Sequence, residues 1–153
     1  VTETSTMTTI LCDTHAVKVI CTPTSTPRLS RIEVVAKSDL TSPIVDDLFQ
    51  TVITPWLTGG DDVLLYVHNA DDHYAVLGAS VITALGARLV TDATARSRIV
   101  GLVMQVKSLC MMTRAAIKIA QSMLPERVSF RVTQSDADTA ERLLKWERRY
   151  NGA

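Results

Sequence analysis

The chain has 153 residues, of which 46% are hydrophobic and 21% charged, a composition typical of one folded domain with a sizeable core. Its 16 basic and 16 acidic side chains give a formal net charge of zero, which excludes a polycationic tail protein, a disordered acidic chain and a collagen-like repeat. The zero conceals an asymmetry. Residues 1–86 hold 4 basic and 10 acidic residues, a net charge of −6, whereas residues 87–153 hold 12 and 6, a net charge of +6.

The first third of the chain is rich in β-branched residues. Residues 1–7 are mostly polar and predict a mobile arm. Residues 8–12, 16–22 and 31–37 predict three strands, because they combine β-branched side chains with alternation of apolar and polar positions. These segments together predict a small β-meander.

From residue 42 the pattern changes to alternating helices and strands. Residues 42–57 predict a helix that begins with Ser-Pro, since serine caps a helix and proline suits its first turn. Residues 62–68 predict a strand covered on both faces. Residues 69–85 predict a second helix, and residues 88–91 a short strand.

The longest predicted helix spans residues 93–124. It is followed by a predicted strand at residues 128–133 and by a last helix that Ser135 caps. The element order, a β-meander and then αβαβαβα, predicts an α/β fold: a two- or three-layer sandwich with a partly parallel mixed sheet. We expect one domain over residues 1–153.

The densest polar cluster is the segment His-Asn-Ala-Asp-Asp-His at residues 68–73. It follows a predicted parallel strand, and open α/β sheets bind ligands at the carboxyl ends of their strands. Imidazoles and carboxylates can hold a divalent metal, and a carboxylate from the next strand connection can join them. One hypothesis is therefore a small metal-dependent phosphoesterase-like or phosphate-binding enzyme. Its candidate catalytic residues are His68, Asp72 and His73, and its candidate metal ligands are His68, Asp71, Asp72 and Asp92.

Residues 68–80 resemble part of the first motif of the DHH phosphoesterases, a strand followed by a His-x-Asn-x-Asp-x-Asp-like loop. The resemblance implies phosphoester hydrolysis at bound metal ions. The chain departs from the family pattern because Asp71 and Asp72 are adjacent and no Asp-His-His triplet follows. The alternative interpretation is that Asn69 and the two aspartates only cap a helix N-terminus.

Other features argue against catalysis and against a membrane location. The chain contains no glycine-rich phosphate loop and no Gly-x-Ser-x-Gly motif. Cys12, Cys21 and Cys110 are an odd number with no metal-ligand spacing, which predicts free thiols in the cytoplasm, with Cys110 buried and inert. The longest apolar stretch, residues 99–112, contains Lys107 and is too short to cross a bilayer.

The predicted helix at residues 93–124 contains cations but no acidic residue. Four of these cations fall within about 40° of one another on a helix of about 100° per residue. These candidate binding residues are Arg96, Lys107, Arg114 and Lys118. Such a stripe can bind an acidic protein surface or nucleic-acid phosphates, or it can simply be solvated.

The leading hypothesis is a non-enzymatic α/β binding or assembly protein that needs no cofactor. The acidic first half offers a surface complementary to the basic second half, which favours a homo-oligomer or another protein partner. Exposed methionines on the long helix would also favour a protein interface. Nucleic acid is the second choice of partner, because the isoelectric point is near 7.0 and aromatic residues make up only 5% of the chain.

Overall fold

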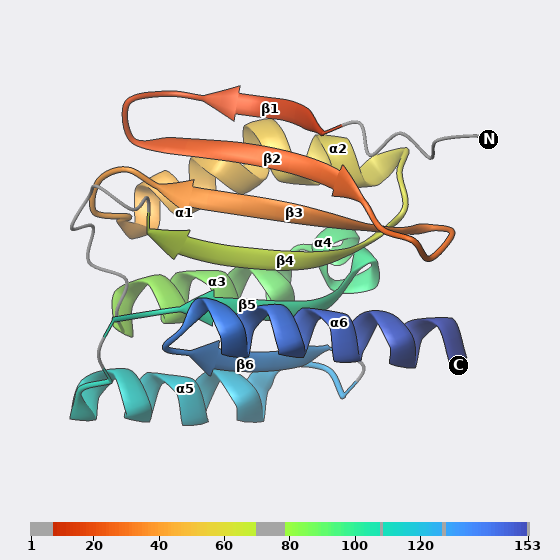
Figure 1. Ribbon diagram of the computed structural model, residues 1–153. Coiled ribbons are helices and arrows are strands. Elements are labelled where there is room, and N and C mark those ends of the chain that lie inside the picture. The colour runs from red at the N-terminus through yellow and green to blue at the C-terminus, as the bar shows by residue number, and fades with distance from the viewer. Residues whose placement is uncertain (1–7, 70–78, 108, 127, 153) are drawn as a thin grey trace.

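The computed structural model describes residues 8–69, 79–107, 109–126 and 128–152, and it contains a six-stranded sheet in the order β1-β2-β3-β4-β5-β6 (Figure 1). Strands β1 to β3 are antiparallel, and β3 to β6 are parallel. The predicted α/β fold with an N-terminal meander is therefore confirmed. The strands are β1 Thr9–Asp13, β2 Val17–Pro23, β3 Leu29–Ala36, β4 Asp62–Asn69, β5 Ile99–Gln105 and β6 Ser129–Thr133.

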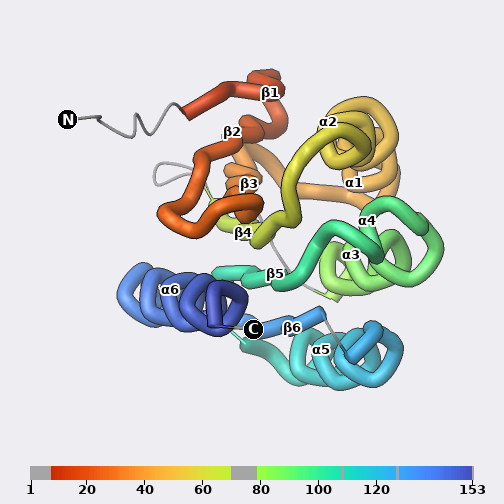
Figure 2. Tube along the Cα trace, turned by 90° about the vertical axis from the view of Figure 1, so that its right-hand side faces the viewer, coloured from red at the N-terminus to blue at the C-terminus, as the bar shows by residue number. Residues whose placement is uncertain are grey.

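The helices lie unequally on the two faces of this sheet. Each parallel strand is added on the same side of the preceding one, and right-handed crossovers then place α1 to α5 on one face. The last helix, α6, follows β6 and is the one helix of the described ranges that lies on the opposite face (Figure 2). The helical segments are α1 Ser42–Leu48, the π-helical η1 Phe49–Ile53, α2 Thr54–Thr58, α3 Ala79–Thr91, α4 Ala93–Arg98, α5 Met111–Met123 and α6 Asp136–Gly152.

Two hydrophobic cores follow from this arrangement. The larger core lies between the sheet and α1 to α5, where alternate residues of the strands point inward. The smaller core lies under α6 and consists of Leu29, Leu64, Val103, Leu143 and Trp146. None of the helices in the described ranges has both the length and the apolar composition that a bilayer span requires.

Polar contacts hold both ends of α6 on the sheet. Near its start, the Gln105 amide donates to Asp136 at 2.8 Å and its oxygen accepts from Thr139 at 2.7 Å. Near its end, the buried carboxylate of Glu147 accepts from the guanidinium of Arg31 at 3.0 Å. These contacts fix the helix, and with it the side chains on its outer face.

Gly101 on β5 allows α6 to pack closely, and we expect Gly101→Ala to lower the free energy of unfolding by about 1–3 kcal/mol. A Cβ atom at this position would lie 2.6 Å from Trp146 Cε3 and 2.9 Å from Leu64 Cδ2. The matched control is Gly59→Ala, because a Cβ there meets nothing within 4 Å. Equal midpoints of urea unfolding for the two variants would contradict this packing.

The predicted helix over residues 93–124 is wrong, because this stretch contains α4, β5 and α5. Five of the seven residues of β5 are buried, so the strand lacks the apolar-polar alternation that marks a half-exposed strand. Its continuous apolar run therefore matches a helix as well as a strand.

The predicted strand at residues 88–91 is also wrong, because α3 continues through Gly86 to Thr91. Gly86 does not end the helix; it faces α5, where a Cβ would lie 3.5 Å from that of Ala120. The predicted helix at residues 69–85 is confirmed for residues 79–85, whereas residues 70–78 lie outside the described residues. The other predicted strands correspond to β1, β2, β3, β4 and β6.

Candidate functional site

A groove runs along the last strand of the sheet. In the described part of the chain β6 pairs only with β5, and its other edge lies between α5 and α6 (Figure 2). A pocket of about 370 Å³ lies between β6 and α6, and a second of about 420 Å³ continues toward the end of α5. We call this surface the β6 groove; it is defined by Ser129–Thr133 of β6, by Gln121 and Ser122 of α5, and by Arg142, Lys145 and Arg149 of α6.

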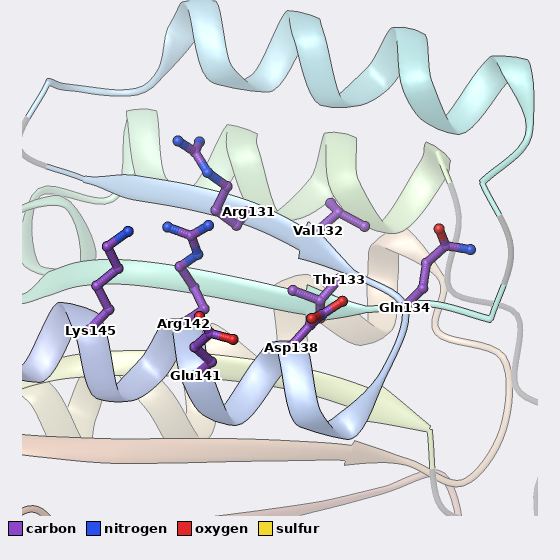
Figure 3. Close-up of a pocket in the computed structure, with 8 residues that line it drawn as sticks. All are labelled: Arg131, Val132, Thr133, Gln134, Asp138, Glu141, Arg142 and Lys145. Atoms are coloured by element: carbon purple, nitrogen blue, oxygen red, sulfur yellow. The ribbon is translucent and has the colours of Figure 1, made fainter.

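Four cations from two elements line the β6 groove. Arg131 extends from β6, while Arg142, Lys145 and Arg149 share one face of α6 because they are three and four residues apart. Figure 3 shows the guanidinium groups of Arg131 and Arg142 near the ammonium group of Lys145 at one end of the first pocket. The groove thus concentrates positive charge.

None of these four cations forms an ion pair with a described residue. Asp138 and Glu141 also line the first pocket and Glu126 the second, but in Figure 3 the carboxylates of Asp138 and Glu141 point away from the three gathered cationic groups. Among the residues that the structure describes, ion pairs form elsewhere, for example between Arg88 and Asp46 and between Arg98 and Asp62. None of those pairs includes a cation of the β6 groove. Their charge is available to an anionic partner.

The floor of the groove is polar backbone. The carbonyl of Phe130 faces it, since the Gln121 amide donates to this oxygen at 3.2 Å and Arg131 donates at 3.0 Å. The carbonyl of Thr133 faces the other way and accepts from the Val106 N–H at 2.9 Å. Because backbone direction alternates along a strand, the N–H and C=O of Val132 face the groove, as those of Phe130 do.

Three of the four predicted binding residues lie around this groove. Arg114 and Lys118 precede Gln121 on α5 by seven and three residues, so they share the helix face from which Gln121 reaches β6. The backbone carbonyl of Lys107 accepts from Gln134, which follows β6, at 3.4 Å. Arg114 and Lys118 form a basic rim on α5, whereas only the backbone of Lys107 is placed beside the groove, and the single helical stripe predicted from the spacing of the four residues is wrong.

Arg96 lies apart from this rim. It belongs to α4 and donates to the Val90 carbonyl at 3.3 Å. The cations at positions 131, 142, 145 and 149 were not among the predicted binding residues. The spacing of the last three was the available signal, because residues three and four apart share one helix face.

His68 belongs to a separate polar pair on the face that carries α6. His68 is the last residue but one of β4, and its Nε2 forms a hydrogen bond with the carboxylate of Glu33 on β3. Its ring stacks on Tyr66 with centroids 4.4 Å apart and an interplanar angle of 12°. Tyr66 in turn donates to Gln105 at 2.7 Å, so these side chains bridge neighbouring strands.

The structure does not bring Asp92 to His68. The Asp92 carboxylate caps α4, accepting from the N–H groups of Thr94 and Ala95 at 3.1 Å, and also accepts from Thr54 at 2.6 Å. It therefore lies near the start of β5, whereas His68 lies near the end of the parallel strand β4. Asp71, Asp72 and His73 lie outside the described residues, and within the described ranges no three His, Cys, Asp or Glu side chains are grouped to hold a metal ion.

Cys110 is exposed at the start of α5, contrary to the prediction of a buried thiol. Its Sγ lies 3.1 Å from the Thr113 hydroxyl, and this hydrogen bond lowers the pKa of the thiol. Burial raises the pKa of Cys21. We expect iodoacetamide to alkylate Cys110 much faster than Cys21 at neutral pH, because the thiolate is the reactive form.

Mass spectrometry of the alkylated protein measures both rates. In Thr113→Val the pH midpoint of Cys110 alkylation should rise, because the stabilising hydroxyl is gone. Equal alkylation rates at Cys21 and Cys110 would contradict the assignment.

The β6 groove is the strongest candidate site because it joins unpaired cations to an open strand edge. Comparison of the chain with protein-family models, with curated proteins and with solved structures finds no match. The chemistry of the groove therefore carries the functional inference.

Proposed function

We propose that the protein is a non-enzymatic binding protein that holds an anionic partner chain in the β6 groove. The observation that carries this proposal is the convergence of Arg131, Arg142, Lys145 and Arg149 on an open strand edge, without an ion pair to any described residue. Hydrogen bonds between ionised partners are about twice as strong as neutral ones, so a matching row of anions would bind well.

The rigidity of the groove supports binding. α6 is fixed through Gln105 at one end and Glu147 at the other, and Trp146 is buried beneath it. The cationic side chains therefore project from a backbone that is already ordered. A partner would have to order fewer groups on association, which reduces the entropic cost.

The charge distribution supports the same function. Residues 87–153 carry a net charge of +6, and Arg114 and Lys118 extend the basic surface of the groove onto α5. Such a concentration of one sign steers an oppositely charged chain toward the site. The acidic first half of a second copy is one source of such a partner, so self-association is part of the proposal.

The outer side of α5 favours a protein as the partner. Met112, Ile119 and Met123 lie on one helix face and are 73%, 60% and 53% exposed. This exposed apolar row lies on the side of α5 opposite Gln121, outside the groove itself, and exposed methionines of this kind are typical of protein interfaces.

The test is a titration with labelled anionic chains, monitored by fluorescence anisotropy. The probes are a ten-residue peptide of alternating glutamate and valine, an oligothymidylate of the same length, and a lysine-valine peptide as the control. We expect at least one anionic probe to bind at about 50 mM salt and to bind more weakly at about 200 mM. The reason is that salt screens the attraction between the cationic side chains of the groove and the anionic groups of the probe. Failure of both anionic probes, or equal binding of the lysine-valine peptide, would overturn the proposal.

Light scattering on the unliganded protein tests the self-association part. Assembly through opposite charges should produce a dimer or larger species at about 50 mM salt that dissociates at higher salt. A monomer at every salt concentration would overturn the self-association part of the proposal.

A further inference from the structure

We infer that the partner of the β6 groove is an acidic peptide in extended conformation that pairs with β6 as a seventh strand. This inference rests on the proposed function and specifies its partner. It follows from three features of the groove: the open backbone edge, the spacing of the cations and the lack of an exposed aromatic ring.

The open edge supplies the backbone partners. Phe130 and Val132 direct their N–H and C=O groups into the groove, and only the Phe130 carbonyl has acceptor contacts in the described structure, from Gln121 and Arg131. An extended peptide satisfies such groups through main-chain hydrogen bonds, the mode called strand addition. α5 and α6 lie on the two sides of β6 and shield its edge from a broad sheet (Figure 2).

The spacing of the cations fits alternate side chains of a strand. On α6, Arg142 and Lys145 are separated by about 4.5 Å of helix rise, and Lys145 and Arg149 by about 6 Å. Side chains on one face of a strand are about 6.6–7 Å apart. Carboxylates at every second position can therefore reach successive cations of α6, with Arg131 beside them.

The opposite face of the added strand would meet α5. Ile117 and Leu124 are half-buried and share the side of α5 that carries Gln121. This side favours apolar residues at the intervening positions. The recognised pattern is consequently an alternation of acidic and β-branched apolar residues.

A nucleic acid fits the groove less well. Proteins that bind single strands stack the bases on aromatic side chains. Two aromatic residues line the pockets along β6, and both are buried: Phe130 is 4% exposed and packs in the larger core, and Trp146 is 5% exposed and packs under α6. The phosphates of a nucleic acid can pair with the arginines, but a nucleic acid has no peptide backbone that could pair with the open edge of β6.

The test compares the glutamate-valine peptide with two N-methylated forms of it, measured by isothermal titration calorimetry. One form carries methyl groups on the backbone nitrogens of the glutamates, and the other on those of the valines. In a paired strand the backbone N–H groups of either the glutamates or the valines face β6, but not both. Methylation of the set that faces β6 removes its hydrogen-bond donors, so we expect that form to bind about 10- to 100-fold more weakly and the other form to bind like the parent. The charge of all three peptides is the same.

Amide hydrogen exchange gives a second readout on the protein itself. We expect the parent peptide to slow exchange of the Phe130 and Val132 amides, which face the groove, because pairing removes them from water.

The outcomes separate this inference from the proposed function. Equal binding of both methylated forms would overturn strand addition and leave a purely ionic groove. Binding of oligothymidylate without binding of the peptide would overturn the peptide partner, while the anion-binding function stands. Binding of neither probe would overturn both.

Discussion

Replacement of Trp146 by alanine is expected to lower the free energy of unfolding by about 3–5 kcal/mol. Trp146 is 5% exposed and packs with Leu64 and Val103 of the sheet and with Leu143 of its own helix. Among the described helices α6 alone lies on this face, so none of the others can move to fill the space left by the indole. Urea unfolding monitored by circular dichroism measures the loss.

The matched control is Leu144→Ala, two residues earlier on the same helix. Leu144 is 43% exposed, and we expect its removal to change the free energy of unfolding by about 0.5 kcal/mol or less. If both variants lost the same amount, the smaller core under α6 would contribute less than its burial indicates.

Reversal of charge at Arg131 and Arg142 is expected to weaken binding of the anionic probe more than 100-fold at low salt. Each substitution by glutamate removes a charged donor, at a cost of about 1.5–3 kcal/mol per lost hydrogen bond, and adds repulsion. The two side chains extend from different elements yet gather at one end of the pocket (Figure 3). Anisotropy titration of the double variant measures the loss.

A second double variant controls for net charge. Lys18→Glu with Arg96→Glu changes the total charge by the same amount, but Lys18 lies on β2 and Arg96 on α4, away from the β6 groove. We expect the control to bind nearly as tightly as the unmodified protein. Equal weakening by both double variants would show that the probe responds to overall charge and not to this groove.

Most of the fold could be predicted because most strands are bounded by clear turn signals or alternate in polarity. The exception is β5, of whose seven residues five are buried and which was predicted as part of a long helix. A strand covered on both faces has no period of its own, so only its partners in the sheet distinguish it from a helix.

The candidate site could be predicted in part. The excess of positive charge in residues 87–153 was evident, and Lys107, Arg114 and Lys118 do lie around the groove. The groove itself depends on β6 being the last strand of the sheet. The order of strands in space is set by tertiary pairing, which no local pattern encodes.

The most direct test of the binding function is a map of amide chemical-shift changes on addition of the glutamate-valine peptide. If the β6 groove is the site, the largest changes fall on Arg131, Val132, Arg142 and Lys145, while Arg96 on α4 is unaffected. If the changes are centred on α4 or spread evenly over the surface, the peptide binds elsewhere and the assignment of the groove is wrong.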